Sequence, residues 1–416
     1  MTAEISILNK SAIVLAGDSA ITIGDGKKVY NTANKIFQLT NKGNVGIMIY
    51  NQATWMGIPL ETIIKTYRIR CGDKVFATLE EYKDTFIDYI KKAIKKYISA
   101  EAQNDIVILK TYDCLDSFFD LAIELFEDEV NTGKIKKPRN ETMELAGISQ
   151  KMQLLLSSYL ETRKKEIRKL NEFKNYTFTS FKTKHTNSIR KAYAEFIEQN
   201  GLKLPTTFLI NLTRLLYYEI TYSISEFEDF TGIVIAGFGD DEIFPKIIDF
   251  KLGELFENKL RLEDGRVGEI SNNRVAIVRP YAQRDMVDTF FQGIEPNLVT
   301  KLSKIVEVEF QKLAKKISTK YSIKGNFLDT LFQKTHVTIG KEFYEYRDKI
   351  HIDPIITTVS FLNKEGLIEL AESLVHITSL KRKTSSDVET VGGPIDVALI
   401  TKGDGFKWIK NKALNK

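Results

Sequence analysis

Short apolar runs bounded by turn residues occur at widely separated places in this chain, and this distribution constrains the fold more than any other feature. The runs lie at residues 3–8, 12–18, 35–39, 45–50, 232–236, 243–250, 274–278, 395–400 and 406–409. Runs of this length, flanked by Gly, Asn and Lys, are typical of β-strands. The sequence therefore predicts strands in three separate parts of the chain.

Helical patterns occupy the segments between these strands. Pro59 stands where a first helical residue would, and Thr78 with Glu81 forms a capping-box pattern ahead of a second helix. The pattern is almost wholly helical over residues 100–229 and again up to about residue 354. A last helix carries a stripe at Leu367, Leu370, Leu374, Ile377 and Leu380. Blocks of strands and helices in one chain favour an α+β sandwich of sheets covered by helices, with helical insertions.

The composition is that of an ordinary globular protein, with 43% apolar and 28% charged residues among 416. The apolar runs are too short to cross a bilayer, and the first residues lack the basic start of a secretion signal, so we expect a cytoplasmic protein with no membrane partner. Cys71 and Cys114 form no disulfide framework and no metal pattern. The common metal, nucleotide and serine-hydrolase motifs are missing from the sequence, so we expect no metal and no cofactor.

Charge is unevenly distributed along the chain. Between Lys151 and Lys191 there are eleven Lys or Arg and three Glu, whereas Asp113 to Glu129 holds seven acids and no base. Aromatic residues that could stack on nucleic-acid bases lie within the basic segment: Phe173, Tyr176, Phe178 and Phe181. The alternative is a solvated helical surface whose aromatic side chains pack inward. We favour this alternative over nucleic-acid binding, because no nucleic-acid motif accompanies the charges.

The first strand begins directly after Thr2, and its hairpin partner ends at Asp18. A two-residue turn at Asn9 and Lys10 would place Thr2 opposite Gly17, and a three-residue turn would place it opposite Asp18. Either register brings the carboxylate of Asp18 beside the start of the chain. Lys35 introduces the third strand.

These residues have a specific chemical use once Met1 is removed. A threonine hydroxyl is a weak nucleophile, and the α-amine freed on Thr2 can serve as its base, because the reference pKa of such an amine is ~7.7 to 8.0. Asp18 can orient the site by accepting hydrogen bonds, and Lys35 can lower the pKa of the hydroxyl. Taken singly, each has a simpler interpretation: Thr2 as an ordinary strand residue, Asp18 as a strand cap and Lys35 as a solvated cation.

The sequence resembles the proteasome β-type subunits and the related bacterial peptidase subunit of ATP-dependent proteases, both N-terminal nucleophile (Ntn) hydrolases. The resemblance rests on Thr2, on "VLAGDSAIT" with Asp18, on Lys35 in "NKIFQL", on "VGIMIY" and the helix after it, and on "VGGPIDVALITKGDGFKWI". It implies a four-layer α-β-β-α sandwich of two antiparallel sheets. The core would comprise residues 1–99, 230–296 and 355–416. Residues 100–229, basic between 151 and 191, and 297–354 would be helical insertions.

The resemblance also implies an activity. The chain would be a threonine-type hydrolase, most simply a proteasome-like peptidase that cleaves amide bonds, with Thr2, Asp18 and Lys35 as its catalytic residues. A backbone N–H of Tyr50 or Asn51 would stabilise the oxyanion. Its partners would be a peptide or protein substrate, further copies of the chain in a homo-oligomer, and an ATPase unfoldase that the sequence does not identify.

The sequence departs from the family pattern around this triad. Tyr50 and Asn51 stand where a Gly-Gly pair is common, and the segment 282–285 replaces the usual Ser-Gly. The supporting candidates Ser386, Asp387 and Thr390 are one or two positions out of register. Two alternatives to an enzyme therefore stay open: a non-catalytic scaffold with the proteasome fold, and a helical module on that fold that binds nucleic acid or another partner.

Overall fold

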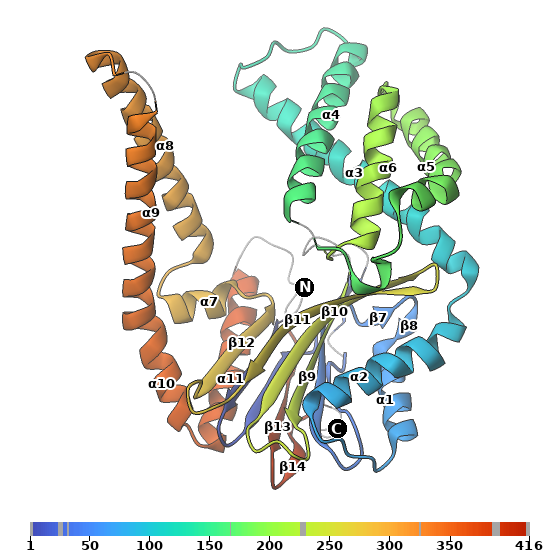
Figure 1. Cartoon of the computed structure of the whole chain (residues 1–416), viewed down its shortest axis with the longest axis vertical. Helices are drawn as coiled ribbons and strands as arrows, with labels where there is room; N and C mark the ends of the chain where they lie inside the picture. Colours follow the sequence, from blue (N-terminus) through green and yellow to red (C-terminus); the bar gives the residue numbers. More distant parts are fainter. Residues whose placement is uncertain are drawn as a thin grey trace.

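The computed structural model describes residues 3–23, 28–30, 33–166, 168–224, 230–323, 326–384 and 392–412 (Figure 1). Its strands are β1 (Ala3–Asn9), β2 (Ile13–Asp18), β3 (Ile21–Ile23), β4 (Lys28–Tyr30), β5 (Ile36–Gln38), β6 (Asn44–Asn51), β7 (Thr54–Trp55), β8 (Ile58–Pro59), β9 (Thr231–Phe238), β10 (Lys246–Phe256), β11 (Lys259–Glu269), β12 (Ala276–Ala282), β13 (Ile395–Thr401) and β14 (Gly405–Lys410). Its α-helices are α1 (Leu60–Cys71), α2 (Leu79–Tyr89), α3 (Ala100–Asn131), α4 (Glu141–Glu166), α5 (Phe178–Asn200), α6 (Thr206–Thr221), α7 (Asp285–Gln292), α8 (Pro296–Tyr321), α9 (Phe327–Arg347), α10 (Asp353–Phe361) and α11 (Lys364–Thr384).

Two antiparallel five-stranded sheets hold strands from distant segments side by side. The first has the order β12-β1-β2-β13-β14, and the second has the order β11-β10-β9-β6-β5. In the first sheet, Ala3 of β1 pairs with Ala282 of β12, and Asp18 of β2 pairs with Ile395 of β13. The N-terminal strands and the C-terminal strand pair therefore belong to one sheet.

The two sheets share a buried core, and helices cover their other faces. Met48 of β6 lies in the core between the sheets, whereas its neighbours Ile47 and Ile49 pack with α1 and α2. On β1, Leu8 faces the core between the sheets, and Ile7 packs with residues of α11. This alternation is the expected consequence of the two-residue period of a strand. The α+β sandwich of two antiparallel sheets is thus confirmed, and membership of the four-layer Ntn class remains a prediction.

Local signals in the sequence account for where the helices begin. The side chain of Thr78 accepts a hydrogen bond from the backbone N–H of Glu81 at 3.3 Å, and the Glu81 carboxylate accepts one from the N–H of Ala77 at 3.0 Å. In a standard capping box, the glutamate would accept a hydrogen bond from the N–H of the cap residue, Thr78. Here it accepts one from the N–H of the preceding residue, Ala77. Pro59 is the cap residue of α1, and the helix begins at Leu60.

Helices α3 to α6 have a hydrophobic core of their own, and the aromatic residues of the basic segment pack into it. Phe173 and Phe181 have no exposed surface, and Tyr176 is buried. The rings of Phe173 and Phe181 each lie 6.3 Å from the ring of Phe256, at the end of β10. These side chains are therefore not available to stack on nucleic-acid bases, which supports the interpretation of this segment as a solvated helical surface.

The first hairpin has a different register from either of the two predicted. Leu8 pairs with Ile13 and Glu4 with Gly17, so the turn is centred on Lys10 and Ser11. The cause is Asn9, whose side-chain oxygen accepts hydrogen bonds from the N–H groups of Ser11 and Ala12. Asp18 consequently lies beside Ala3. The predicted pairings of Thr2 with Gly17 or Asp18 are wrong.

Strand β11 is absent from the sequence-based prediction. It pairs with β10 in a long hairpin, with Leu252 opposite Leu262 and Phe256 opposite Lys259. Much of its length is exposed at the edge of the second sheet, and it carries the sequence LEDGRVGE. An exposed, charged edge strand has little of the apolar alternation that identifies a strand.

No described helix combines the length and the apolar character that a membrane crossing requires.

Candidate active site

Asp18, the last residue of β2, holds a fully engaged carboxylate in the interior of the protein. Oδ1 accepts hydrogen bonds from Lys35 Nζ at 2.6 Å and from the backbone N–H of Ala3 at 3.0 Å. Oδ2 accepts from the N–H of Gly392 at 2.9 Å and of Ala20 at 3.4 Å. The residue is 2% exposed. Donors from separate segments therefore fix the orientation of this carboxylate beside the start of β1.

Lys35 lies directly before β5 and reaches Asp18 across the two sheets. Its backbone C=O accepts a hydrogen bond from the N–H of Ile49 at 2.8 Å, which ties it to β6. Its ammonium group also lies 3.1 Å from Oε1 of Glu4. The structure thus brings together two of the three predicted catalytic residues, and it shows that Lys35 is buried rather than solvated.

Glu4 is a member of this cluster that the sequence interpretation missed. Its side chain has no exposed surface, and it stands on the face of β1 that also carries Ser6 and Leu8. A charged residue within an otherwise apolar strand was the available signal, because a buried carboxylate requires a cation. The lysine that satisfies it comes from a segment about thirty residues away, as the numbering shows, so strand pattern alone could not identify the partner.

The cluster carries two carboxylates and one ammonium group. In the contacts described, both carboxylates share the ammonium group of Lys35. Removing ions from water is costly, and the attraction between them offsets that cost only when each is paired. A protonated amine placed next to Asp18 and Glu4 would be stabilised by their negative charge.

The oxyanion candidates Tyr50 and Asn51 end strand β6, directly after the residue that binds the Lys35 carbonyl. The Tyr50 ring packs 5.0 Å from the ring of Tyr281 and 6.1 Å from that of Phe230. Asn51 has a left-handed backbone conformation, with φ of 69°, and its side-chain nitrogen donates to the carbonyl of Phe230 at 2.9 Å. Ile49 directly precedes Tyr50 and binds the Lys35 carbonyl, so it connects both oxyanion candidates to the cluster of Asp18, Lys35 and Glu4.

The phenol of Tyr50 stays protonated at every ordinary pH. Burial raises the pKa of Tyr50 far above its usual value, and the negative charges of Asp249 and Glu4 act in the same direction. Burial likewise raises the pKa of Tyr281 to about 12. The ring of Tyr50 also explains a glycine on the neighbouring strand, because a Cβ on Gly232 would lie 2.1 Å from Cζ of Tyr50.

A second cation, Lys412, contacts Ser19, the residue that follows Asp18. Ser19 Oγ donates to the carbonyl of Pro394 at 2.6 Å and accepts a hydrogen bond from Lys412 Nζ at 2.9 Å. The same ammonium group lies 2.8 Å from Oδ2 of Asp396. These contacts tie the end of β2 to β13 and to the C-terminal segment. Sequence interpretation did not single out Ser19, Asp396 or Lys412.

Several predicted residues lie outside the described part of the chain. They are Thr2, Ser386, Asp387 and Thr390. Gly392, which binds Asp18, is the first described residue after the stretch of sequence that contains the last three. At the other departure from the family pattern, Gln283 is buried and its side-chain oxygen accepts a hydrogen bond from Nε of Arg382 in the last turn of α11.

A small hollow begins where β6 ends. Its volume is about 210 Å³, and it is lined by residues that include Gln52, Thr54, Phe230 and Glu254. Nothing on its walls resembles a metal site, and no group of three or more His, Cys, Asp or Glu side chains with metal-binding placement occurs among the described residues. The polar contacts described near the start of β1 are hydrogen bonds to Asp18 and the ion pairs of one buried lysine with two carboxylates.

Comparisons with known proteins leave the family open. No protein-family model matches the chain, and no curated protein is significantly similar in sequence. Among the solved structures that match is a Gly-1 mutant of Anbu from Hyphomicrobium sp. strain MC1. The match covers 99% of this chain and 86% of that chain, at 9% identity and a TM-score of 0.28. A likeness at that TM-score supports no conclusion about activity.

Proposed function

We propose that this protein is an N-terminal threonine hydrolase of the four-layer Ntn class, a proteasome-like peptidase that uses Thr2 after removal of Met1. The observation that carries the proposal is the hydrogen bond from the N–H of Ala3 to the carboxylate of Asp18, which also holds Lys35. Ala3 directly follows Thr2 in the chain. The buried pair of Asp18 and Lys35 is therefore anchored to the residue next to the proposed nucleophile.

The proposed reaction is acyl transfer from an amide. The hydroxyl oxygen of Thr2 attacks the carbonyl carbon while the α-amine of Thr2 accepts the hydroxyl proton. The proton then passes to the leaving nitrogen as the C–N bond breaks, which leaves an ester on Thr2. Water hydrolyses this ester and regenerates the hydroxyl. Lys35 and Asp18 orient and polarise the nucleophile, and the N–H of Tyr50 or Asn51 stabilises the oxyanion.

The hollow at the end of β6 suits one side chain of a peptide substrate. It starts directly after the proposed oxyanion residues and has both apolar and polar walls, with Phe230 on one side and Gln52 on another. Peptides and proteins are accordingly the proposed substrate class. The separate hydrophobic core of α3 to α6 supports the proposed division into an Ntn core and a helical insertion over residues 100–229.

One observation favours a second candidate, a non-catalytic scaffold with the same fold. Lys35 is shared between Asp18 and Glu4, so its positive charge is already compensated twice. A lysine held in this way polarises a neighbouring hydroxyl less than a lysine with one carboxylate does. In a scaffold, the cluster would serve only to join the two sheets.

The deciding experiment combines intact-mass analysis of the purified chain with labelling by a peptide epoxyketone, which requires both the hydroxyl and the amine of an N-terminal threonine. The enzyme proposal predicts loss of Met1 and a single adduct on Thr2. Thr2→Ser should retain labelling, whereas Thr2→Ala and Asp18→Asn should lose it with the fold intact by circular dichroism.

Two results would overturn the proposal. One is a chain that retains Met1 and stays unlabelled, and the other is labelling that is equal in the wild type and Thr2→Ala. A folded, unlabelled wild type would support the scaffold. For a variant that removes Lys35, the matched control is Lys65→Met. Lys65 is an exposed residue of α1 that, among the contacts described, pairs only with its helix neighbour Glu61.

A further inference from the structure

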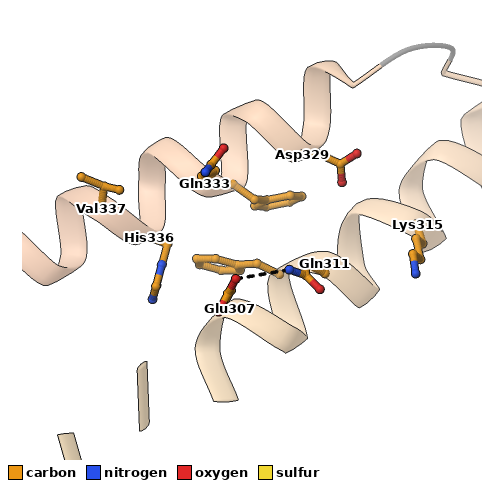
Figure 2. Close-up of a pocket in the computed structure, with 9 residues that line it drawn as sticks. Glu307, Gln311, Lys315, Asp329, Gln333, His336 and Val337 are labelled. Atoms are coloured by element: carbon orange, nitrogen blue, oxygen red, sulfur yellow. Dashed lines mark hydrogen bonds between the residues drawn. The ribbon is translucent and has the colours of Figure 1, made fainter. Parts of the chain in front are cut away.

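Helices α8 and α9 form an antiparallel pair that extends away from the two sheets (Figure 1). Of the residues described in these two helices, Ala314 and Leu328 alone are buried. Phe310 and Phe332 stack at 5.2 Å, and beside them lies a groove of about 520 Å³. Figure 2 shows that polar side chains such as Gln311 and Gln333 line this groove. The pair therefore buries very little apolar surface by itself.

The outward face of α8 carries large apolar side chains in a regular stripe. Its members follow one another at intervals of three, four or eight residues, which places them on one side of a helix. The apolar members are Leu298, Leu302, Ile305 and Leu313, and two lysines, Lys316 and Lys320, continue the stripe. The four apolar members are between 43% and 56% exposed. Glu309 completes the stripe and is paired with Lys312 at 2.6 Å. An apolar stripe of this length on a protruding helix is typical of a protein-protein contact.

Charge determines what can cover this stripe. Helix α8 contains six lysines and two glutamates, so a second α8 would be repelled. Helix α3 has the opposite character, with nine acidic residues and one lysine. One of its faces is exposed along its length and carries Leu109, Asp113, Asp116, Asp120, Glu124 and Glu127 at intervals of three or four residues.

The acidic face of α3 is itself strained by its charges. Like charges at these intervals on a helix destabilise it. Partial burial raises the pKa of the Asp116 carboxyl, and the negative charge of Asp120 raises it further. Lysines placed against this face would relieve the repulsion, and Leu109 would meet the leucines of α8.

We propose that the α8 stripe of one copy of this chain docks on the acidic face of α3 of a second copy. In a single chain, the α8–α9 pair and the α3–α6 bundle stand on opposite sides of the molecule (Figure 1). Each copy therefore presents both surfaces at once. A contact between two different surfaces is heterologous. When each copy makes this contact with the next, the copies form a closed ring or a filament. The proposal does not depend on catalysis by Thr2.

The test measures the mass of the full chain by light scattering at about 0.1 M and about 1 M salt, between which the Debye length falls from about 10 Å to 3 Å. We expect an assembly of several copies at low salt that is weakened at high salt. Lys316→Glu/Lys320→Glu and Asp116→Lys/Asp120→Lys should each remain single chains at low salt. Lys136→Glu/Lys137→Glu, which makes the same charge change in an exposed loop, should assemble like the wild type.

Mixing separates this proposal from other modes of assembly. The α8 variant keeps an intact α3 face, and the α3 variant keeps an intact α8 stripe, so these two surfaces should pair when the variants are mixed. The reversed surfaces, acidic on α8 and basic on α3, should also pair, so the mixture should assemble from both variants in equal amounts. A chain carrying both pairs of changes should assemble again, because its charges are reversed on both sides. A wild type of single-chain mass at low salt, an α8 variant that still assembles alone, or a mixture that stays at single-chain mass would overturn the proposal.

Discussion

Lys35 Nζ lies 3.1 Å from Oε1 of Glu4, and at most 5% of either side chain is exposed. The contact joins β1 of the first sheet to the segment that precedes β5 of the second. Asp18 binds the same ammonium group at 2.6 Å. One lysine thus connects both sheets at the end of the sandwich where the chain begins, and it does so whether or not the protein is an enzyme.

Replacing Lys35 should destabilise the fold strongly. Lys35→Met leaves two buried carboxylates without their cation, and breaking a buried ion pair in this way costs roughly 3–5 kcal/mol. Urea unfolding followed by circular dichroism measures this loss. Lys65→Met should cost at most about 0.5 kcal/mol, because its ion pair is exposed.

The double variant Lys35→Met/Glu4→Gln checks the cause. Removing one of the two orphaned carboxylates should restore part of the stability lost in Lys35→Met. If the double variant is no more stable than Lys35→Met, the loss reflects altered packing rather than uncompensated charge.

Glu4 should set the pH dependence of the proposed reaction. A negative charge near an amine favours its protonated form, which cannot act as a base. Glu4→Gln should therefore move the acidic limb of the kcat/KM profile to lower pH, by roughly half a unit to one unit. Asp18, Lys35, the phenol of Tyr50 and Tyr281, which is opposite Glu4 in the pairing of β1 with β12, are ionisable groups near Glu4 in the described structure. An unmoved profile in an active variant would leave Glu4 with a structural role only.

The parts of the structure that the sequence predicted correctly are those fixed by local chemistry. The strands around Asn9, the cap at Thr78 and the last strand pair depend on neighbours within a few residues. The register of the first hairpin was missed because the side chain of Asn9 forms hydrogen bonds with the turn. The contact of Glu4 with Lys35 was missed because it depends on how the two sheets pack, which no local pattern records. Asp18 and Lys35 were identified from their places at the end of the first hairpin and before the third strand, together with the chemistry that an N-terminal threonine requires.

Gly232→Ala should displace the Tyr50 ring. A Cβ at residue 232 would lie 2.1 Å from Cζ of Tyr50, so the ring must leave its place against Tyr281. We expect a loss of stability of roughly 1–3 kcal/mol, as for other overpacked cores. Because both changes act on the same contact, Gly232→Ala should cost much less in a Tyr50→Ala background. Equal costs in the two backgrounds would contradict this explanation, and urea unfolding of the four proteins measures them.

Phe173→Ala distinguishes a core residue from a nucleic-acid contact. The side chain has no exposed surface, and truncating a buried phenylalanine costs roughly 3–5 kcal/mol. Phe178→Ala should cost less, because Phe178 is only partly buried. Fluorescence anisotropy with a labelled single-stranded oligonucleotide should give the same signal for wild type and variant. Weaker oligonucleotide binding by a stable Phe173→Ala protein would restore the stacking interpretation.

Glu254 should make stability depend on pH in the acidic range. Burial alone would raise the pKa of this carboxyl, but the charges of Arg261 and Lys110 outweigh burial and lower it to about 2, from 4.5 in a free chain. A depressed pKa in the folded state contributes stability that is present above pH 4.5 and is lost as the pH falls toward 2. Because about a quarter of the Glu254 side chain is exposed, we expect a contribution of about 2 kcal/mol. Glu254→Gln should therefore lower the free energy of unfolding at pH 6, and the difference from wild type should shrink toward pH 2.5, whereas the exposed control Glu198→Gln should show no such trend. A difference that stays constant with pH would mean that Glu254 acts through packing between α3 and the β10–β11 hairpin and not through its charge.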